Sequence, residues 1–109
     1  MNKIKSYIQD IIKNEIESHS INNWHGITKE NLNQHLLLSP KLEVYIDGLN
    51  VNKRFKLWTV LEEYPEEKKV YTIFYDEKEN EFGLGLKSPE GKLTFIGYYG
   101  GFIETLNGM

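Results

Sequence analysis

The chain has 109 residues, of which 39% are hydrophobic and 27% charged, a composition that suits one folded domain with one core. A formal charge of −3 argues against a nucleic-acid partner, and zero cysteines exclude disulfides and thiolate metal sites. The longest apolar run, Leu36 to Leu38, is too short to span a membrane, and the first twelve residues do not form a signal peptide. We therefore expect a cytoplasmic protein with no membrane contact.

An amphipathic helix is expected over the first eighteen residues, and a loop over residues 18–26. Thr28 can cap a short second helix with Leu32 and Leu36 facing inward, and Pro40 would end it. Residues 1–39 are thus the predicted helical part. The stripe that defines the first helix has apolar residues at steps of three and four: Ile4, Tyr7, Ile8, Ile11, Ile12 and Ile16.

After Pro40 the apolar spacing becomes alternating, and turn residues recur at short intervals. This pattern predicts a mostly antiparallel sheet of about five strands over residues 41–98, and a short C-terminal helical turn within residues 99–109. The predicted fold class is α+β, a single domain over residues 1–109 with the N-terminal helix packed on the sheet. The expected strands are Lys41 to Asp47, Lys53 to Tyr64, Val70 to Tyr75, Glu81 to Lys87 and Lys92 to Tyr98.

The second and third strands carry large apolar side chains on both faces, so something must cover both sides. The first helix is expected to cover the face of Phe55, Leu57, Leu61 and Phe74. The opposite face is either a second layer of core or a partner surface, and it holds Trp58, Val60, Tyr71, Ile73 and Tyr75.

No constellation of catalytic residues is evident. His19, His25 and His35 lack the spacing of a helical metal pair, and no nucleophile is paired with a base. Gly83 and Gly85 lack a phosphate-binding motif and are better explained as making room for an aromatic neighbour or as marking a bend in the strand. We expect no enzyme activity, no metal and no cofactor.

The charge distribution is the informative feature. Between Glu62 and Glu81, eight acidic residues stand against three lysines, a local balance of −5, and the two acidic turns fall at opposite ends of the predicted sheet. Carboxylates in solvated turns can serve solubility alone, and catalytic paired carboxylates would need a sugar cleft that a domain of this size rarely has. Carboxylates beside aromatic side chains can also recognise a basic partner, by steering its approach and then anchoring it. The candidate partner-binding residues are Trp58, Glu62, Glu63, Tyr64, Glu66, Glu67 and Tyr71.

Four segments carry a family resemblance: Leu57 to Glu63, Tyr71 to Glu77, Phe82 to Leu86 and Gly97 to Leu106. Over about residues 55–109 the chain resembles small bacterial immunity proteins of polymorphic toxin and contact-dependent inhibition systems. Such proteins are typically small, α+β and often acidic, and they block a cognate toxin domain, commonly a nuclease. The resemblance implies inhibition by occlusion. It transfers no binding residue, because these segments are sheet-core patterns.

The sequence thus predicts a non-catalytic binding protein that neutralises a basic toxin domain. One alternative is a small-ligand or enzyme module with a pocket near Trp24 and His25. Another is a self-associating structural domain that buries Trp58, Tyr71 and Tyr75 against a second copy. The sequence leaves open whether the chain is a monomer or a homodimer.

Overall fold

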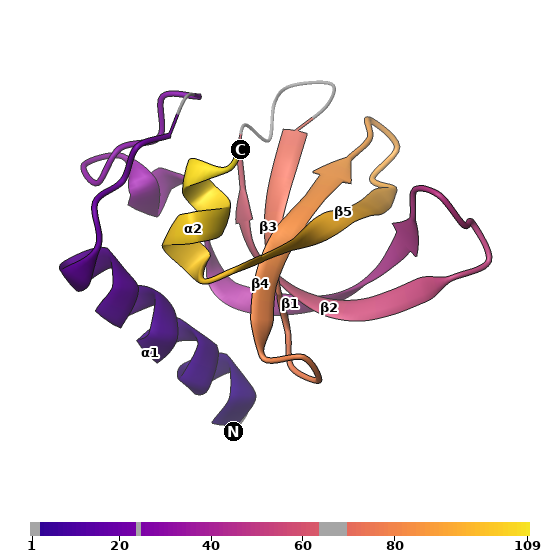
Figure 1. Cartoon of the computed structure of the whole chain (residues 1–109), viewed down its shortest axis with the longest axis horizontal. Helices are drawn as coiled ribbons and strands as arrows, with labels where there is room; N and C mark the ends of the chain where they lie inside the picture. The colour runs from indigo at the N-terminus through magenta and orange to yellow at the C-terminus, as the bar shows by residue number, and fades with distance from the viewer. Residues whose placement is uncertain (1–2, 24, 64–69) are drawn as a thin grey trace.

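The computed structural model describes residues 3–23, 25–63 and 70–109. Helix α1 (Lys3–Ser18) is followed by a short 3-10 turn, η1 (Leu32–Gln34), then five strands and a second helix (Figure 1). The first helix and the α+β class are as expected. The later elements are β1 (Leu36–Asp47), β2 (Arg54–Glu62), β3 (Val70–Asp76), β4 (Glu81–Lys87), β5 (Leu93–Gly100) and α2 (Phe102–Asn107).

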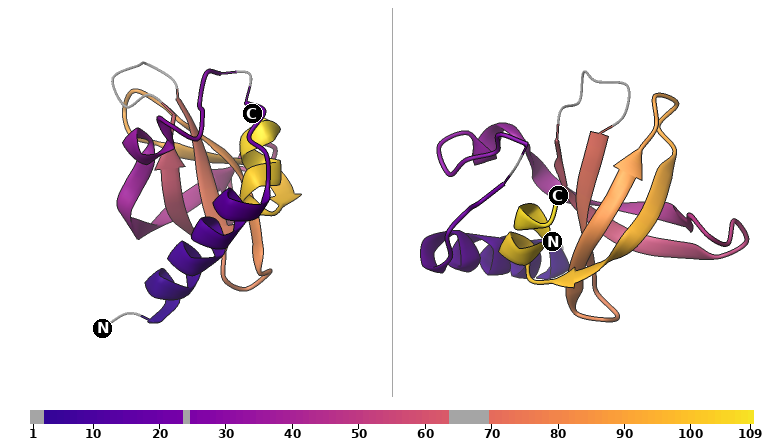
Figure 2. Two further views of the ribbon diagram at one scale, coloured as in Figure 1. Left: turned by 90° about the vertical axis from the view of Figure 1, so that its left-hand side faces the viewer. Right: turned by 45° about the horizontal axis from the view of Figure 1, so that its top comes forward.

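The five strands close into a small barrel. Consecutive strands pair antiparallel, and β1 also pairs with β5 in parallel, where Ile46 lies opposite Thr94 and Asp47 opposite Phe95. Figure 2 shows the curved sheet with α1 and α2 together on one side of it. The barrel therefore has an inside that no helix reaches and an outside that the helices cover in part.

Tyr45 fills the inside of the barrel. Its side chain is 0% exposed, and its ring packs on Phe74 with a centroid distance of 5.2 Å. The phenol oxygen lies 2.7 Å from the Thr59 hydroxyl and 3.1 Å from the Thr72 hydroxyl, so the one polar group of this large side chain is satisfied in a dry interior. Leu57 and Leu93 complete the buried part of this inner cluster.

Two glycines of β4 make room for these rings. A Cβ added to Gly85 would lie 2.4 Å from Tyr45 Cε2, and one added to Gly83 would lie 2.5 Å from Phe74 Cζ. The expectation that these glycines accommodate aromatic neighbours is confirmed.

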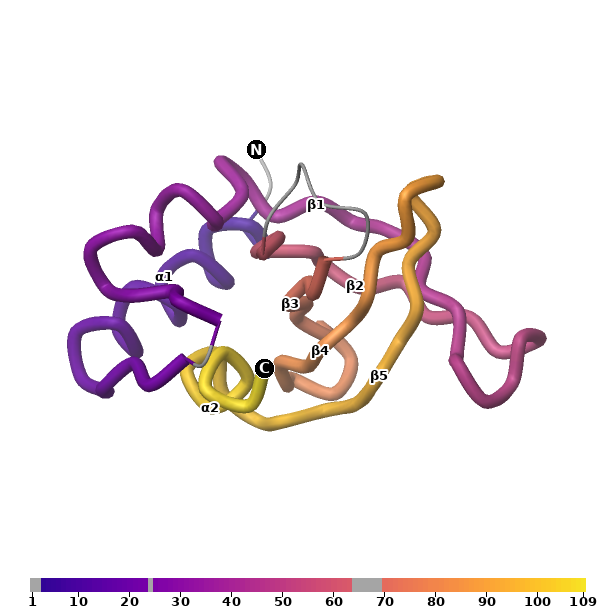
Figure 3. Tube along the Cα trace, turned by 90° about the horizontal axis from the view of Figure 1, so that it is seen from above, coloured from indigo at the N-terminus to yellow at the C-terminus, as the bar shows by residue number. Residues whose placement is uncertain are grey.

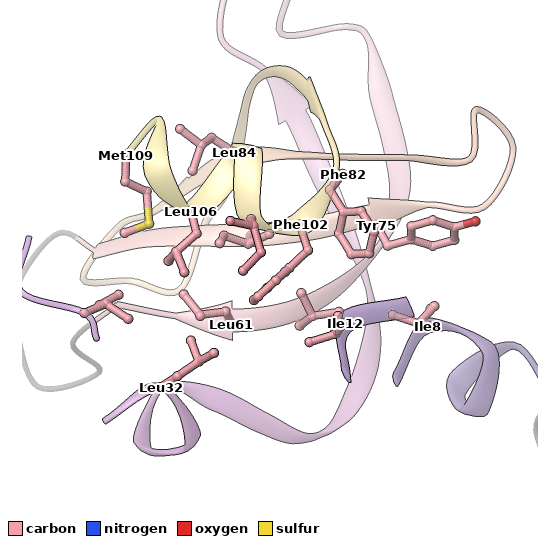
Figure 4. Close-up of a cluster of buried hydrophobic side chains, with 14 of the residues drawn as sticks. Ile8, Ile12, Leu32, Leu61, Tyr75, Phe82, Leu84, Phe102, Leu106 and Met109 are labelled. Carbon is pink, nitrogen blue, oxygen red and sulfur yellow. The ribbon is translucent and has the colours of Figure 1, made fainter. Parts of the chain in front are cut away.

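A second cluster lies outside the barrel, between its wall and the two helices. Ile8 and Ile12 of α1 and Phe102 and Leu106 of α2 project toward the sheet, and Leu61 is among the strand residues that meet them (Figure 4). The strands also contribute Trp58, Val60, Ile73, Tyr75, Phe82 and Leu84. The apolar residues on this face of β2 and β3 are therefore a second layer of core.

The expected pairing of helix and sheet face is wrong. Leu57 and Phe74 belong to the inside of the barrel, whereas α1 packs on the face of Trp58 and Val60. The cause is closure: a sheet that curls into a barrel covers one face with itself. Leu61 still packs outside, because the register of β2 against β3 shifts between Thr59 and Leu61.

The predicted second helix is also wrong. Thr28 accepts a hydrogen bond from the Asn31 amide at 3.3 Å, as a cap would, but only η1 follows, and β1 begins at Leu36. Leu36 pairs with Leu61 of β2, so a sheet partner takes residues that the pattern assigned to a helix. Pro40 lies where the ladder shifts register, a place that tolerates its missing amide hydrogen.

Gly85→Ala tests the packing inside the barrel. The new methyl group would overlap the Tyr45 ring, and we expect the free energy of unfolding to fall by about 1–3 kcal/mol. Gly97→Ala is the matched control, since a Cβ there meets nothing within 4 Å. Urea unfolding of both variants provides the measurement, and equal effects would contradict this packing.

Alkaline pH tests the environment of Tyr45. Burial raises the pKa of its phenol from 10.0 to about 12. Above pH 10 the unfolded chain loses this proton while the folded chain keeps it, so the contribution to stability is complete below pH 10 and is lost as the pH rises through about 12. Between pH 8 and 12 the free energy of unfolding is expected to fall less steeply in Tyr45→Phe than in the wild type. If stability falls with pH equally in both proteins, the raised pKa does not belong to Tyr45.

Candidate functional site

The nominated partner-binding residues do not form one surface. Tyr64, Glu66 and Glu67 lie outside the residues that the structure describes. Of the other four, Glu62, Glu63 and Tyr71 lie together where β2 ends and β3 begins. Trp58 lies farther back on β2, opposite Tyr75 and toward the β3–β4 turn. The structure thus separates two acidic ends of the sheet, each with its own aromatic neighbours.

At the first end, Glu63 is held inside the chain. It is 6% exposed, it pairs with Nδ1 of His25, and its other carboxylate oxygen accepts a hydrogen bond from the Tyr71 amide at 3.3 Å. The His25 ring also packs edge-on against Tyr71, with a centroid distance of 5.4 Å. This cluster fastens the loop that contains His25 to the sheet.

Glu62 is engaged in a similar way. Its carboxylate lies 2.8 Å from Nζ of Lys87 on β4. Both described carboxylates at this end therefore have cationic or hydrogen-bonding partners within the chain, and a contact through them would have to displace those partners.

The second end is the β3–β4 turn, residues 76–81, which has four acidic residues and one lysine. Glu77 and Glu79 are exposed, and the buried Asp76 holds the turn by accepting hydrogen bonds from the backbone amides of Lys78 and Glu79. Trp58 belongs here: it is 7% exposed and its indole Nε1 donates to Glu77 at 3.4 Å. This turn presents negative charge to solvent on a rigid frame.

A hollow of about 300 Å³ adjoins this turn. Its aromatic wall comes from Tyr7 of α1 and Tyr75 of β3, whose rings meet edge-on at 6.3 Å. Its polar residues are Glu15, the two tyrosines and Asn80 of the acidic turn, whose Oδ1 accepts hydrogen bonds from both phenols. Glu15 also accepts a hydrogen bond from the Ile103 amide at 3.0 Å, which fixes its position. Ile11, Phe82, Gly100 and Gly101 complete the lining.

The tyrosines at this end are hydrogen-bond donors rather than acids. Burial, the neighbouring Tyr7 and nearby carboxylates raise the pKa of Tyr75 to about 12. Burial and a hydrogen bond to Asp76 also raise the pKa of Tyr98. Both phenols keep their protons at physiological pH, so they orient neighbouring groups and supply no phenolate nucleophile.

The sequence did not single out this hollow. The sequence pattern placed Tyr7 among the inward-facing apolar residues of the first helix. In the structure its side chain is 49% exposed and lies near the acidic turn. Glu15 reads as a solvated helix residue, and Asn80 as an ordinary turn residue. Only the packing of α1 across the sheet brings the three together, and no spacing in the sequence signals it.

A second concavity, about 270 Å³, lies between α1, η1 and β1. Its wall is mainly apolar, with Ile12, Ile16, Leu36 and Val60 among its residues, and Gln9 ties α1 to β1 there through the Leu38 carbonyl at 3.3 Å. The sequence did not predict this groove, because it assigned the residues of η1 and the start of β1 to a helix.

Trp24 lies outside the described residues, so the alternative of a pocket near Trp24 and His25 stays a prediction. The self-association alternative rests on Trp58, Tyr71 and Tyr75, of which Tyr71 is half-buried. Trp58 and Tyr75 are buried within their own chain, which leaves them little area for a second copy.

Within residues 3–23, 25–63 and 70–109, no three histidine or acidic side chains are grouped to hold a metal ion, and no helix is both long and apolar enough to cross a membrane. No family model matches the chain, and searches of curated proteins and of solved structures also found no match.

Glu63→Ala tests the internal role of this carboxylate. Removing it leaves the Tyr71 amide and His25 without their acceptor, and we expect a loss of about 1–3 kcal/mol in the free energy of unfolding. Glu79→Ala, in an exposed position, is the matched control and should change stability by less than about 0.5 kcal/mol. Thermal unfolding of both variants measures the difference, and a neutral Glu63→Ala would show that the residue is available to a partner.

Proposed function

We propose that this chain is a non-catalytic binding protein that occludes a basic protein partner, and that the partner is a toxin domain of the kind that bacterial immunity proteins block. The observation that carries the proposal is the hollow beside the β3–β4 turn. It combines a carboxylate, phenol and amide oxygens and aromatic walls next to exposed glutamates. That combination suits a guanidinium or ammonium group.

The geometry supports an arginine or lysine of the partner as the anchor. Tyr7, which is 49% exposed, offers a ring face to a cation, and Glu15 offers the opposite charge. Glu77 and Glu79 stand outside the hollow, where they raise the rate of encounter with a basic surface. A toxin that uses cationic residues on phosphate would lose them to this surface, so occlusion needs no chemistry from the chain itself.

The proposal moves the contact from the β2–β3 end to the β3–β4 end. The sequence predicted both acidic ends of the sheet. At the β2–β3 end, Glu62 and Glu63 are paired with Lys87 and His25 of the same chain. At the β3–β4 end, by contrast, two glutamates are exposed and a hollow lies beside them. Tyr7, Glu15, Glu77 and Glu79 are therefore the contacts of this proposal, whereas Tyr64, Glu66 and Glu67 lie outside the described residues and stay predictions.

The test is binding to a basic toxin domain, taken from the C-terminus of a large secreted protein where the gene immediately upstream encodes one. Glu77→Lys with Glu79→Lys is expected to slow association by on the order of tenfold, since both charges steer the encounter. Glu30→Lys, exposed and remote from the turn, is the matched control. Surface plasmon resonance at two salt concentrations measures the rates.

Two results would contradict the proposal. One is unchanged association of the Glu77→Lys, Glu79→Lys variant with that domain. The other is growth arrest by the domain that co-expression of the wild-type chain does not relieve.

A further inference from the structure

The hairpin that joins β1 to β2 projects from the barrel as an arm and reaches farther from α1 than any other part of the traced chain (Figure 3). Leu49 at its tip is 100% exposed and Val51 is 69% exposed. These two apolar side chains stand together on a projecting turn and contribute nothing to the core.

The tip is built to hold these side chains outward. The Asp47 carboxylate accepts a hydrogen bond from the Leu49 amide at 2.8 Å, and the Asn50 side chain accepts one from the Asn52 amide at 3.1 Å. The Lys53 amide closes the turn on the Asn50 carbonyl at 2.9 Å. With its backbone satisfied locally, the turn presents Leu49 and Val51 without further ordering.

The arm is also basic. Residues 47–56 contain Lys53, Arg54 and Lys56 against one acidic residue, Asp47, whose carboxylate is bound to the Leu49 amide, in a chain whose formal charge is −3. All three cations are exposed, and Lys56 lies opposite Val44, which is itself half exposed on the outer face of β1. An apolar tip therefore stands in front of a band of positive charge, while the acidic β3–β4 turn belongs to a different hairpin.

We propose that this arm inserts its tip into an anionic phospholipid surface. Leu49 and Val51 would enter the boundary between headgroups and acyl chains, and Lys53, Arg54 and Lys56 would lie among the anionic headgroups. A protein partner fits less well, because a stable interface covers about 800 Å² on each side and a narrow convex turn offers little area. A lipid surface needs no complementary shape.

This inference departs from the expectation of no membrane contact, which rested on the lack of a spanning segment. A surface contact requires only a small apolar tip and cations. It is independent of the proposed function, since the arm and the hollow share no residue.

Co-sedimentation of the whole chain with lipid vesicles tests the proposal. Vesicles of phosphatidylcholine with phosphatidylserine are expected to bind the chain, and vesicles of phosphatidylcholine alone are expected to bind it more weakly. Leu49→Asn with Val51→Asn should lower the partition coefficient about tenfold or more, because two apolar side chains no longer leave water. Replacing the three cations by glutamine should remove the preference for phosphatidylserine.

Leu38→Asn is the matched control, since Leu38 is also 100% exposed but lies at the other end of β1. It should bind vesicles as the wild type does. An equal loss in Leu38→Asn would overturn the proposal, as would a failure of the wild type to sediment with either vesicle. The second result would assign the arm to an acidic protein partner instead. Circular dichroism of each variant confirms that it is folded.

Discussion

The packing of Tyr45 inside the closed barrel is the constraint on which the rest of the structure depends. Its ring occupies the space that Gly85 leaves, as Phe74 occupies the space beside Gly83, and its hydroxyl is satisfied by Thr59 and Thr72. Because the inner face is filled in this way, both helices must pack outside. There α1 crosses toward the β3–β4 turn and creates the hollow beside it.

Much of this fold could be predicted from local patterns. The first helix and the fourth strand follow from the periodicity of their apolar residues, and the bounds of β4 are the predicted ones. Barrel closure could not be predicted, because it depends on a short parallel pairing of β1 with β5 that leaves no periodic signal. Because closure was not predicted, the helix was also assigned to the wrong face of β2. Residues 28–40 were ambiguous in principle, since Leu32 and Leu36 suit a helix and Leu36 to Leu38 equally suit a strand.

The candidate site was harder to predict than the fold. The acidic turns are visible in the sequence, but whether a carboxylate is available depends on partners that are distant along the chain. Glu63 finds His25 and Glu62 finds Lys87 only after folding. The hollow likewise brings Tyr7 and Glu15 of α1 next to Asn80 of the β3–β4 turn, and each of them has an ordinary local role when read alone.

The central claim is that the hollow beside the acidic turn accepts a cationic side chain. An NMR titration of backbone amides with an arginine amide tests it directly, with the uncharged citrulline amide as the matched ligand. The amides of Gly100, Gly101 and Asn80 line or border the hollow and should shift in a saturable way with the arginine ligand alone. Shifts that are equal for the two ligands, or that fall elsewhere on the chain, would contradict the claim.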